Sequence, residues 1–388
     1  MYNRKSNLAF ARRHVRSQPR WDRHAKEDPG EATEMALVLN NALAFDVLCL
    51  QAADEGRGEI LFGDCLECVR REAPPFIIDG SFPSVYLEYP LIGDPFLDIT
   101  ILYNEGVAKG QRVNSPLVAG TEAAMDWFTN LDDGYKGISF GYELDTKDPS
   151  LPVAAIHFQP RRHRQLVDPF CQAVGEPEQA HLYHEVNERL PPAWELSFFG
   201  MFRGRSNSPL RVCGYLHQQE IQACTDPKRL KSVFDAVGFT SYSKEMLEQA
   251  TTLIDGATQS ADFQFDVYPD GTLGDTFAFD VSYNIQRPEL VYENFENGKA
   301  AKLMRQLEEW GVADERWHLT SGATFSRAIP LEREDGSFGR YHFVVQPQWE
   351  KVRWTACKLM PAKSYLFATA GWMDESKAEG HQDDAMMS

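Results

Sequence analysis

Two aspartates in the segment ADFQFDVYPDGTLGDTFAFDVSYN, residues 261–284, occupy positions from which a carboxylate could do chemistry. Asp266 and Asp280 lie opposite the phenylalanines on either side of a Pro-Asp-Gly turn, so they share one face of a predicted hairpin. Glu195 occupies the same kind of position in another predicted hairpin. A carboxylate there could take a proton from a phenol, an indole or a peptide side chain. The alternative is that these three acids only neutralise nearby cations, or that the face is an ordinary wet surface.

Cationic and aromatic side chains follow the same alternation in other predicted strands. In the segment EKVRWTACK, for example, Lys351 and Arg353 fall on the face opposite Val352 and Trp354. Several cations on one face can bind an anionic ligand, or they can simply be solvated charges. The residues that the pattern offers for substrate binding are Arg211, Tyr215, His217, Tyr268, Arg340, His342, Lys351 and Arg353.

Three short motifs that often mark a site lack the context that their chemistry needs. The segment Gly137–Gly141 matches GxSxG, but a strand continues after Ser139 where a nucleophile elbow requires a helix. The CxxC of Cys65–Cys68 has no second ligand pair nearby, and His181–Glu185 does not match the HExxH zinc motif. No dinucleotide or Walker loop is present in the sequence. We therefore predict no metal site.

The elements that must position these residues form a repeated pattern of one helical region followed by a strand pair. Helical patterns are predicted in the ranges 31–53, 120–131, 177–190, 226–254 and 292–310, and strand pairs in the ranges 84–103, 137–158, 194–216, 261–284 and 339–359, the last with a turn at 346–348. Strands joined by tight turns are antiparallel. Ten such strands can close into a barrel whose apolar face meets the helices and whose polar face lines the interior. We therefore predict an α/β fold of the α+β type, a ten-stranded antiparallel barrel with helices outside.

This five-fold helix–hairpin pattern over residues 31–370 resembles the αββα ("ABBA") barrel of aromatic prenyltransferases. The resemblance implies an enzyme that transfers an isoprenyl group from a diphosphate co-substrate to an aromatic or peptide acceptor. It implies that no cofactor is required and that Mg²⁺ is possible but not needed. The diphosphate would then be held by cations and the allyl cation shielded by aromatic rings. On this basis the diphosphate ligands would be Arg211, Arg340, Lys351 and Arg353, the shield Tyr215 and Tyr268, and the base Asp266 or Glu195.

A second resemblance is looser. The segments FFGMFRGRSNSPLRVCGYL and FPSVYLEYPLIGDPFLDITILY are similar to segments of uncharacterised bacterial proteins, some of which are associated with peptide-modifying enzymes. Two alternatives therefore stay open. One is another peptide-tailoring enzyme on the same barrel, a lyase or a hydrolase that uses Ser139. The other is a non-catalytic module that binds a peptide.

Composition limits the partners and the cellular location. The chain has 388 residues and a net charge of −18, which argues against nucleic acid or an anionic membrane as the main partner. The seven cysteines are scattered and odd in number, which favours the reducing cytoplasm. We predict a basic flexible arm at 1–30, a single barrel domain at 31–370 and a disordered acidic tail at 371–388. The expected substrate is a small molecule or a peptide, and the sequence does not specify an oligomeric state.

Overall fold

The computed structural model describes residues 40–77, 82–104, 121–131, 135, 137–144, 153, 155–202, 208–216, 218–256, 261–282, 289–333 and 336–373. The predicted arm at 1–30 and most of the predicted tail lie outside these residues, although the last strand continues to Trp372. The strands are β1 (Ser84–Pro90), β2 (Asp98–Asn104), β3 (Ser139–Leu144), β4 (Ala155–Gln159), β5 (Trp194–Met201), β6 (Leu210–Leu216), β7 (Ala261–Val267), β8 (Leu273–Ser282), β9 (Phe325–Glu332), β10 (Phe338–Thr355), β11 (Lys358–Leu359) and β12 (Lys363–Trp372).

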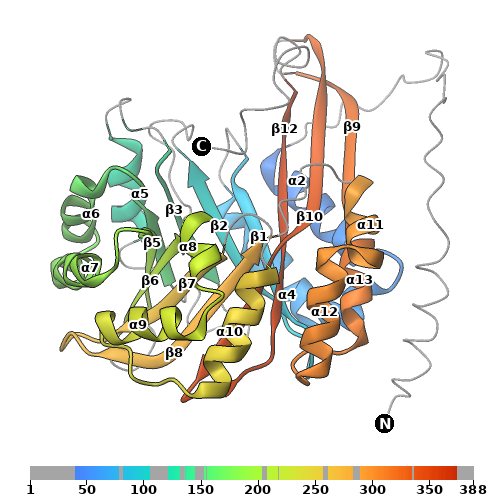
Figure 1. Ribbon diagram of the computed structural model, residues 1–388. Coiled ribbons are helices and arrows are strands. Elements are labelled where there is room, and N and C mark those ends of the chain that lie inside the picture. Colours follow the sequence, from blue (N-terminus) through green and yellow to red (C-terminus); the bar gives the residue numbers. More distant parts are fainter. Residues whose placement is uncertain are drawn as a thin grey trace.

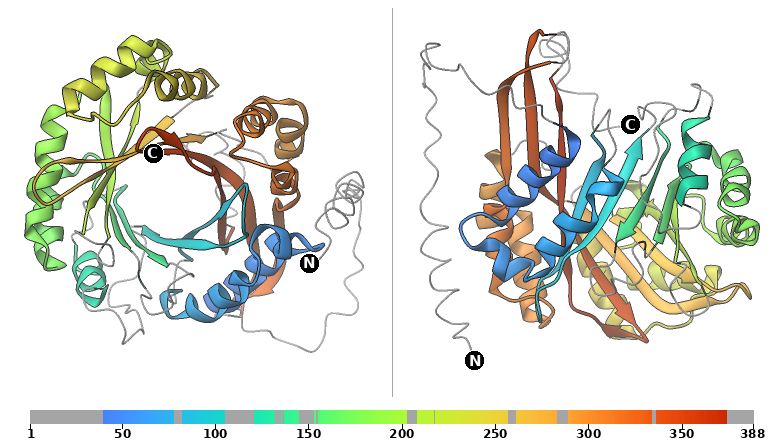
Figure 2. Two further views of the ribbon diagram at one scale, coloured as in Figure 1. Left: turned by 90° about the horizontal axis from the view of Figure 1, so that it is seen from below. Right: turned by 180° about the vertical axis from the view of Figure 1, so that it is seen from behind.

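The strands form a closed antiparallel barrel, which confirms the predicted fold class. Ten of them follow one another around the ring in the order β10-β12-β1-β2-β3-β4-β5-β6-β7-β8, and β8 pairs with β10 to close it. Seen along its axis, the barrel is a ring of strands with helices on the outside (Figure 2). Closure leaves no unpaired edge in the ring, so every strand is held on both sides.

The helices lie between the hairpins in the chain and cover the outside of the barrel (Figure 1). They are α2 (Asn41–Ala53), α3 (Arg57–Leu61), α4 (Cys65–Glu72), α5 (Thr121–Thr129), α6 (Val167–Ala173), α7 (Pro177–Arg189), α8 (Gln218–Ala223), α9 (Pro227–Val237), α10 (Lys244–Gly256), α11 (Glu289–Asn297), α12 (Lys299–Glu309) and α13 (His318–Gly322), with short 3₁₀ turns η1 (Pro74–Phe76), η2 (Arg164–Leu166) and η3 (Glu315–Trp317). No described helix has the length and apolar character that crossing a membrane requires.

Local sequence signals set the ends of several helices. Asp226 caps α9 by accepting a hydrogen bond from the Lys228 N–H at 2.9 Å, and Pro227 occupies the first helical position. Ser243 Oγ accepts from the Met246 N–H at 3.1 Å at the start of α10. The two caps explain why the predicted helical range 226–254 forms two helices, α9 and α10. The part of the first predicted helix that precedes residue 40 lies outside the described residues, and α2 supplies the rest.

The first and fourth predicted hairpins form as expected. In the fourth, Gly271 adopts a φ of 79°, a left-handed conformation that glycine reaches without steric cost, and the Tyr268 N–H donates to the Thr272 carbonyl at 2.9 Å. The second and third predicted turns fall largely outside the described residues.

The fifth predicted hairpin is wrong in its turn. The chain does not reverse at 346–348, because β10 continues through Pro347 with only a bulge before Trp349. It reverses instead at Ala356 and Cys357, which have φ values of 46° and 66°, and returns along β10 as the short β11 and then as β12. A bulge adds one residue to one strand without ending it.

The long β10 serves two structures in succession. Its second half pairs with β8 and closes the barrel, whereas its first half pairs on the same edge with β9. The upper parts of β9, β10 and β12 therefore rise above the ring in Figure 1. Before the bulge the even-numbered residues of β10 face inward, and after it the odd-numbered residues do. Lys351 therefore faces inward as predicted, although the predicted turn is wrong.

Candidate active site on the inner face of the barrel

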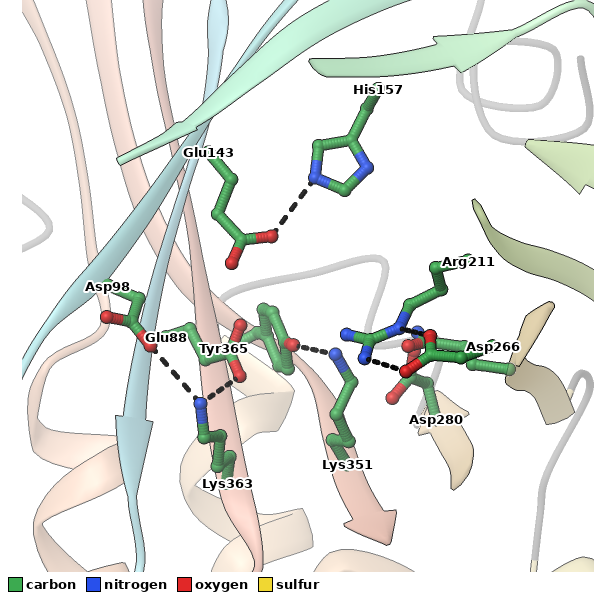
Figure 3. A network of polar contacts seen from close by, with 11 residues as sticks. Glu88, Asp98, Glu143, His157, Arg211, Asp266, Asp280, Lys351, Lys363 and Tyr365 are labelled. Atoms are coloured by element: carbon green, nitrogen blue, oxygen red, sulfur yellow. Dashed lines mark hydrogen bonds and ion pairs between the residues drawn. The ribbon is translucent and has the colours of Figure 1, made fainter. Parts of the chain in front are cut away.

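The two faces of the barrel wall differ sharply in chemistry. On the outer face, apolar side chains such as Leu87, Phe140 and Phe279 are fully buried against the helices. On the inner face, polar and charged side chains alternate with them. Figure 3 shows such side chains from different strands converging on one region of the interior. Because side chains alternate along a strand, burial of the apolar set against the helices fixes the polar set inside.

One row of inward residues crosses six neighbouring strands. Its members are directly opposite one another in the sheet register and are Glu195, Tyr215, Asp262, Asp280, Lys351 and Lys363, from β5, β6, β7, β8, β10 and β12. The row changes from acidic to cationic between β8 and β10. The inner wall therefore has an acidic side and a cationic side, and the two meet between Asp280 and Lys351.

The cationic side holds a buried ionic network. The ammonium group of Lys363 lies 2.7 Å from Glu88 Oε1 and 3.2 Å from Asp98 Oδ2. Lys351 donates a hydrogen bond to the hydroxyl of Tyr365 and lies 4.9 Å from the centre of that ring. Glu88 and Asp98 belong to β1 and β2, the strands that follow β12 around the ring. The network thus ties the closing strands of the barrel to its first hairpin.

Glu88 is ionised although it is buried. Its exposed fraction is 7%. Burial alone would raise its pKa, but the charges of Lys351 and Lys363 and a hydrogen bond from Tyr365 outweigh burial and lower the pKa well below the ordinary value. The carboxylate therefore stays ionised throughout the neutral range.

Lys363 is also stabilised in its charged form. Burial favours loss of its proton, but Glu88 and Asp98 together raise its pKa above the ordinary value. Two carboxylates around one ammonium group leave the triad with a net negative charge. Lys363 alone therefore does not neutralise both Glu88 and Asp98.

Arg211 and Asp266 form a two-pronged ion pair between β6 and β7. Arg211 Nε donates to Asp266 Oδ1 at 2.8 Å, and the terminal nitrogen donates to Oδ2 at 3.1 Å. The guanidinium also lies 4.5 Å from the ring centre of Phe202. Both oxygens of Asp266 are occupied by one partner, so this carboxylate acts first as a counter-ion.

Asp280 and Asp262 lie side by side on the acidic side of the row. Burial raises the pKa of Asp280 to about 6, with the charge of Glu88 adding to the effect and Lys351 and Arg211 opposing it. Burial, with the charge of Asp280, raises the pKa of Asp262 to about 8. Asp280 is buried and Asp262 is partly exposed. Two neighbouring carboxyls shielded from water cannot both ionise cheaply, so the pair retains a proton near neutral pH.

Aromatic rings line the inner face directly beside the cationic side. The ring of Tyr86 lies 4.9 Å from that of Trp349 and 5.4 Å from that of Phe367, between centroids. Trp349 also lies 6.3 Å from Tyr365, which carries the hydrogen bond from Lys351. We call Tyr86, Trp349, Tyr365 and Phe367 the aromatic cluster. It adjoins the lysines at Tyr365, so a charged group and an apolar chain of one ligand could be bound together.

Two further inward acids have partners of their own. Tyr215 donates to Glu195 Oε2 at 3.0 Å, and burial followed by this hydrogen bond raises the pKa of Tyr215 to about 12. Glu143 Oε2 lies 3.1 Å from His157 Nε2 at another level of the barrel, in the upper part of Figure 3.

The structure brings together some of the residues predicted from the sequence. Arg211, Tyr215, Lys351 and Arg353 share the inner face with the three predicted acids. Arg340 and His342 do not join them, because they lie on the half of β10 that pairs with β9. Arg340 is exposed, and at about 3.3 Å per residue it lies roughly 35 Å along the strand from Lys351.

The other predicted residues lie at the margins. Tyr268 follows β7 at the hairpin turn, and His217 lies outside the described residues. His342 makes a hydrogen bond with Ser326 at 2.9 Å, and burial followed by the charge of Arg340 lowers its pKa. Tyr268 and His342 are therefore away from the row.

Sequence reasoning missed Glu88, Asp262, Lys363 and Tyr365. Lys363 and Tyr365 belong to β12, which lies beyond the fifth predicted strand pair at 339–359, because the turn predicted at 346–348 divided β10 into the two strands of that pair. Glu88 and Asp262 obey the same alternation that picked out Asp266 and were visible as polar positions between apolar ones. The alternation in these two strands therefore predicts Glu88 and Asp262 as inward residues.

The motifs set aside in the sequence have ordinary structural surroundings. Ser139 lies in β3, within a sheet rather than at a strand-to-helix turn, and donates to Gln159 Oε1 at 2.6 Å. All seven cysteines are free. Within the described residues, no group of three or more His, Cys, Asp or Glu side chains is arranged to hold a metal ion.

Comparison with known proteins gives a match in structure alone. No family model and no curated protein matches the sequence. Among solved structures, the 5-dimethylallyltryptophan synthase from Streptomyces coelicolor is similar with a TM-score of 0.50 and 10% identity, covering 85% of this chain and 97% of that one. The prenyltransferase PriB in a ternary complex with L-tryptophan and dimethylallyl thiolodiphosphate is similar with a TM-score of 0.43 and 11% identity, covering 85% of this chain and 96% of that one. The resemblance inferred from the sequence is thus confirmed at the level of the fold: this chain has the αββα barrel of the ABBA-type aromatic prenyltransferases.

Proposed function

We propose that this protein is a prenyltransferase that moves an isoprenyl group from a diphosphate donor to an aromatic or peptide acceptor, without a metal requirement. The observation that carries the proposal is the contact between the aromatic cluster and the lysines on the inner face of a closed barrel. A prenyl diphosphate has the same two parts, an anionic head and an apolar allylic chain. The shared barrel fold with a dimethylallyl transferase supports this reading.

The diphosphate would bind at Lys351 and Arg353, with Lys363 beside them. Within the described part of the chain neither Lys351 nor Arg353 forms an ion pair, so both charges are available to a ligand. Lys351 and Lys363 are directly opposite in the register of β10 and β12. Lys363 already has Glu88 and Asp98 as counter-ions, so the charges that a diphosphate would meet first are those of Lys351 and Arg353.

The aromatic cluster would stabilise the allyl cation. When the bond between C1 and the diphosphate oxygen breaks, its electron pair leaves with the diphosphate. Positive charge then develops on the allyl group, and each ring face that meets it contributes about 0.5–2 kcal/mol. The rings also exclude water, which would otherwise capture the cation.

Glu88 is the base that the geometry favours. It is ionised, it lies opposite Tyr365 in the register of β1 and β12, and Tyr86 lies two residues before it on the same face. The carboxylate is thus at the boundary between the cations and the rings, where C1 of the donor would lie. The acceptor atom would bond to C1 and its proton would pass to Glu88. All three candidate acids have partners: Lys363 lies 2.7 Å from Oε1 of Glu88, Arg211 donates to both oxygens of Asp266, and Tyr215 donates to Glu195. Glu88 is preferred because it lies beside both the lysines and the aromatic cluster.

A mass-shift assay tests the proposal directly. The full chain would be incubated with dimethylallyl or geranyl diphosphate and a panel of aromatic and peptide acceptors, and donor binding would be measured by calorimetry. We expect a product heavier by one prenyl unit, and Lys351→Met to weaken donor binding by 10-fold or more, because a hydrogen bond to a charged group contributes about 1.5–3 kcal/mol. Arg340→Ala is the matched control on the same strand and leaves binding unchanged. Absence of binding by any isoprenyl diphosphate, or an equal loss in both variants, overturns the proposal.

The same assay separates the other candidate functions. A peptide that binds without any mass change would indicate a non-catalytic module, and the acidic chain favours a basic peptide. A hydrolase that uses Ser139 finds no support in the surroundings of that residue. The proposed location is the reducing cytosol, with which the seven free cysteines agree.

A further inference from the structure

The acidic side of the row contains a buried carboxyl group that has an unused oxygen. Asp280 is 8% exposed and its Oδ2 accepts a hydrogen bond from the side-chain amide of Gln264. Its Oδ1 is buried and has no hydrogen-bond partner. A buried carboxylate oxygen without a donor is unfavourable, and native proteins supply such atoms with a partner or a ligand. This oxygen belongs to a side chain on the inner face (Figure 3).

Asp262 is the direct neighbour of Asp280 across the sheet. Directly opposite residues in an antiparallel pair have Cβ atoms about 4.5–5.5 Å apart, and like charges there destabilise the sheet. Among the described residues, neither aspartate has a cation within ion-pair distance. The pair is therefore a concentration of acid that the chain itself does not neutralise.

The cations nearest to the pair act on it electrostatically, but in the described part of the chain none forms an ion pair with either aspartate. Lys351, the register neighbour of Asp280, donates its hydrogen bond to Tyr365, and Arg211 is bound to Asp266. Arg161 is close enough to lower the pKa of Asp262 but forms no ion pair with it in the described structure. Glu88 adds negative charge from β1. No side chain on these elements fills the role of counter-ion.

Aromatic rings complete the surroundings. Tyr215 is the register neighbour of Asp262 on β6, and Asp262 acts electrostatically on both Tyr215 and Tyr86. Aromatic rings and carboxylates in one site are the combination that binds organic cations, because both attract positive charge.

We infer that Asp262 and Asp280 together bind a guanidinium group of the acceptor, as in an arginine side chain or an arginine-like small molecule. The planar guanidinium has five N–H donors in a fixed fork and can bridge two carboxyl groups on neighbouring strands, whereas an ammonium group acts as a point charge. The inference rests on the proposed function and specifies its acceptor. The donor would occupy the cationic side of the row and the acceptor the acidic side, so the two substrates meet between Lys351 and Asp280.

Without a ligand, Asp262 and Asp280 reduce their mutual repulsion by keeping a proton. With pKa values of about 8 and about 6, the two aspartates carry about one proton between them at pH 7. A bound guanidinium replaces that proton, so binding releases it to the buffer. This release provides a measurement on the unaltered protein.

The test is calorimetry with a pair of matched probes, N-acetyl-arginine amide and N-acetyl-citrulline amide, which have nearly the same shape but differ in charge. We expect the arginine probe to bind the full chain at least 10-fold more tightly at pH 7, with release of about one proton when buffers of different ionisation enthalpy are compared. Asp262→Asn and Asp280→Asn reduce the preference to less than 3-fold. Asp275→Asn, an exposed aspartate on the same strand as Asp280, leaves it unchanged.

Each outcome has a separate meaning. Equal binding of the two probes, no binding of either, or binding of the arginine probe without proton release overturns the guanidinium site even if both aspartate variants fail to fold. Dimethylallyl thiolodiphosphate is titrated in the same experiment as the donor probe. Donor binding without arginine preference rejects this inference alone, and arginine preference without donor binding rejects the prenyltransferase and leaves the cation site.

Discussion

Glu88 and Glu350 are two buried glutamates in the same barrel wall, and they face opposite sides of it. Glu88 faces the interior, where Lys363 lies 2.7 Å from it. Glu350 is 0% exposed and faces the helices, where its Oε1 accepts a hydrogen bond from Ser364 Oγ at 3.0 Å. The neighbours of Glu350 on that side include Tyr89, whose hydroxyl donates to Thr320 of α13 at 2.9 Å. No cation is paired with Glu350 among the described residues.

The same side chain therefore has opposite protonation on the two faces. Burial raises the pKa of Glu350 well above its ordinary value, and the hydrogen bond from Ser364 offsets this only in part. The cations around Glu88 reverse the effect of burial and lower its pKa. Burial alone therefore does not decide the charge of a carboxyl group; a neighbouring cation does, and Glu88 has one where Glu350 has none among the described residues. Glu88 is thus ionised in the barrel interior, and Glu350 is protonated in the layer between the barrel wall and the helices.

Replacing the ionised member of this comparison has the largest expected effect. Glu88→Gln keeps the shape of the side chain but removes the base, and general-base catalysis typically contributes 10²–10⁴-fold. We expect kcat for prenyl transfer to fall by about that factor, while the affinity for dimethylallyl diphosphate changes by less than 3-fold. The measurement is steady-state kinetics alongside calorimetry of donor binding. Retention of more than a third of the activity would exclude Glu88 as the base and direct attention to Asp280.

Removing the cation next to Glu88 tests why the two glutamates differ. Lys363→Met leaves Glu88 and Asp98 buried without their counter-ion, and breaking a buried ion pair in this way costs about 3–5 kcal/mol of unfolding free energy. The pKa of Glu88 rises, so the acidic limb of the pH–rate profile moves to higher pH. Urea unfolding and a pH–rate profile measure the two effects. The double variant Lys363→Met/Glu88→Gln is the control and should recover part of the stability, since it removes one of the two orphaned charges. If it is no more stable than the single variant, the pair is not coupled as described.

The contrast between the two faces was largely readable from the sequence. Alternation along each strand predicts Asp266, Asp280 and Lys351 on the inner face, and the five-fold order of helices and hairpins predicts the barrel. Closure was not readable, because it depends on β8 meeting the second half of β10, a pairing between residues about 70 positions apart along the chain.

What the sequence concealed had two physical causes. Proline at 347 is a turn signal in most contexts, but here it sits at a bulge within a long strand, and the real reversal uses Ala356 and Cys357, which carry no turn signal. The partnerships inside the barrel were the second gap. Alternation says which way a side chain points but not which residue it meets, so the pairing of Asp266 with Arg211 required the register of β6 and β7.

The smallest effect on catalysis is expected from the neutral member of the pair. Glu350→Gln replaces a protonated carboxyl by an amide of similar shape, so activity should stay within 2-fold of the wild type.

The unfolding free energies of the wild type and Glu350→Gln should differ with pH in a direction that follows from the raised pKa of Glu350. Below the ordinary pKa of glutamate, both the folded and the unfolded states carry the proton and the wild type has its full stability. As pH rises towards the pKa of the folded state, only the unfolded state loses the proton, and the wild type loses up to about 1.4 kcal/mol per pH unit relative to Glu350→Gln. For Glu88 the direction is opposite, because its lowered pKa gives stability that is present at neutral pH and lost on acidification. Urea unfolding at pH 5, 6, 7 and 8 of the wild type and the two glutamine variants measures both slopes, and parallel curves for Glu350→Gln and the wild type would show that Glu350 is ionised and that the two faces of the wall do not differ as described.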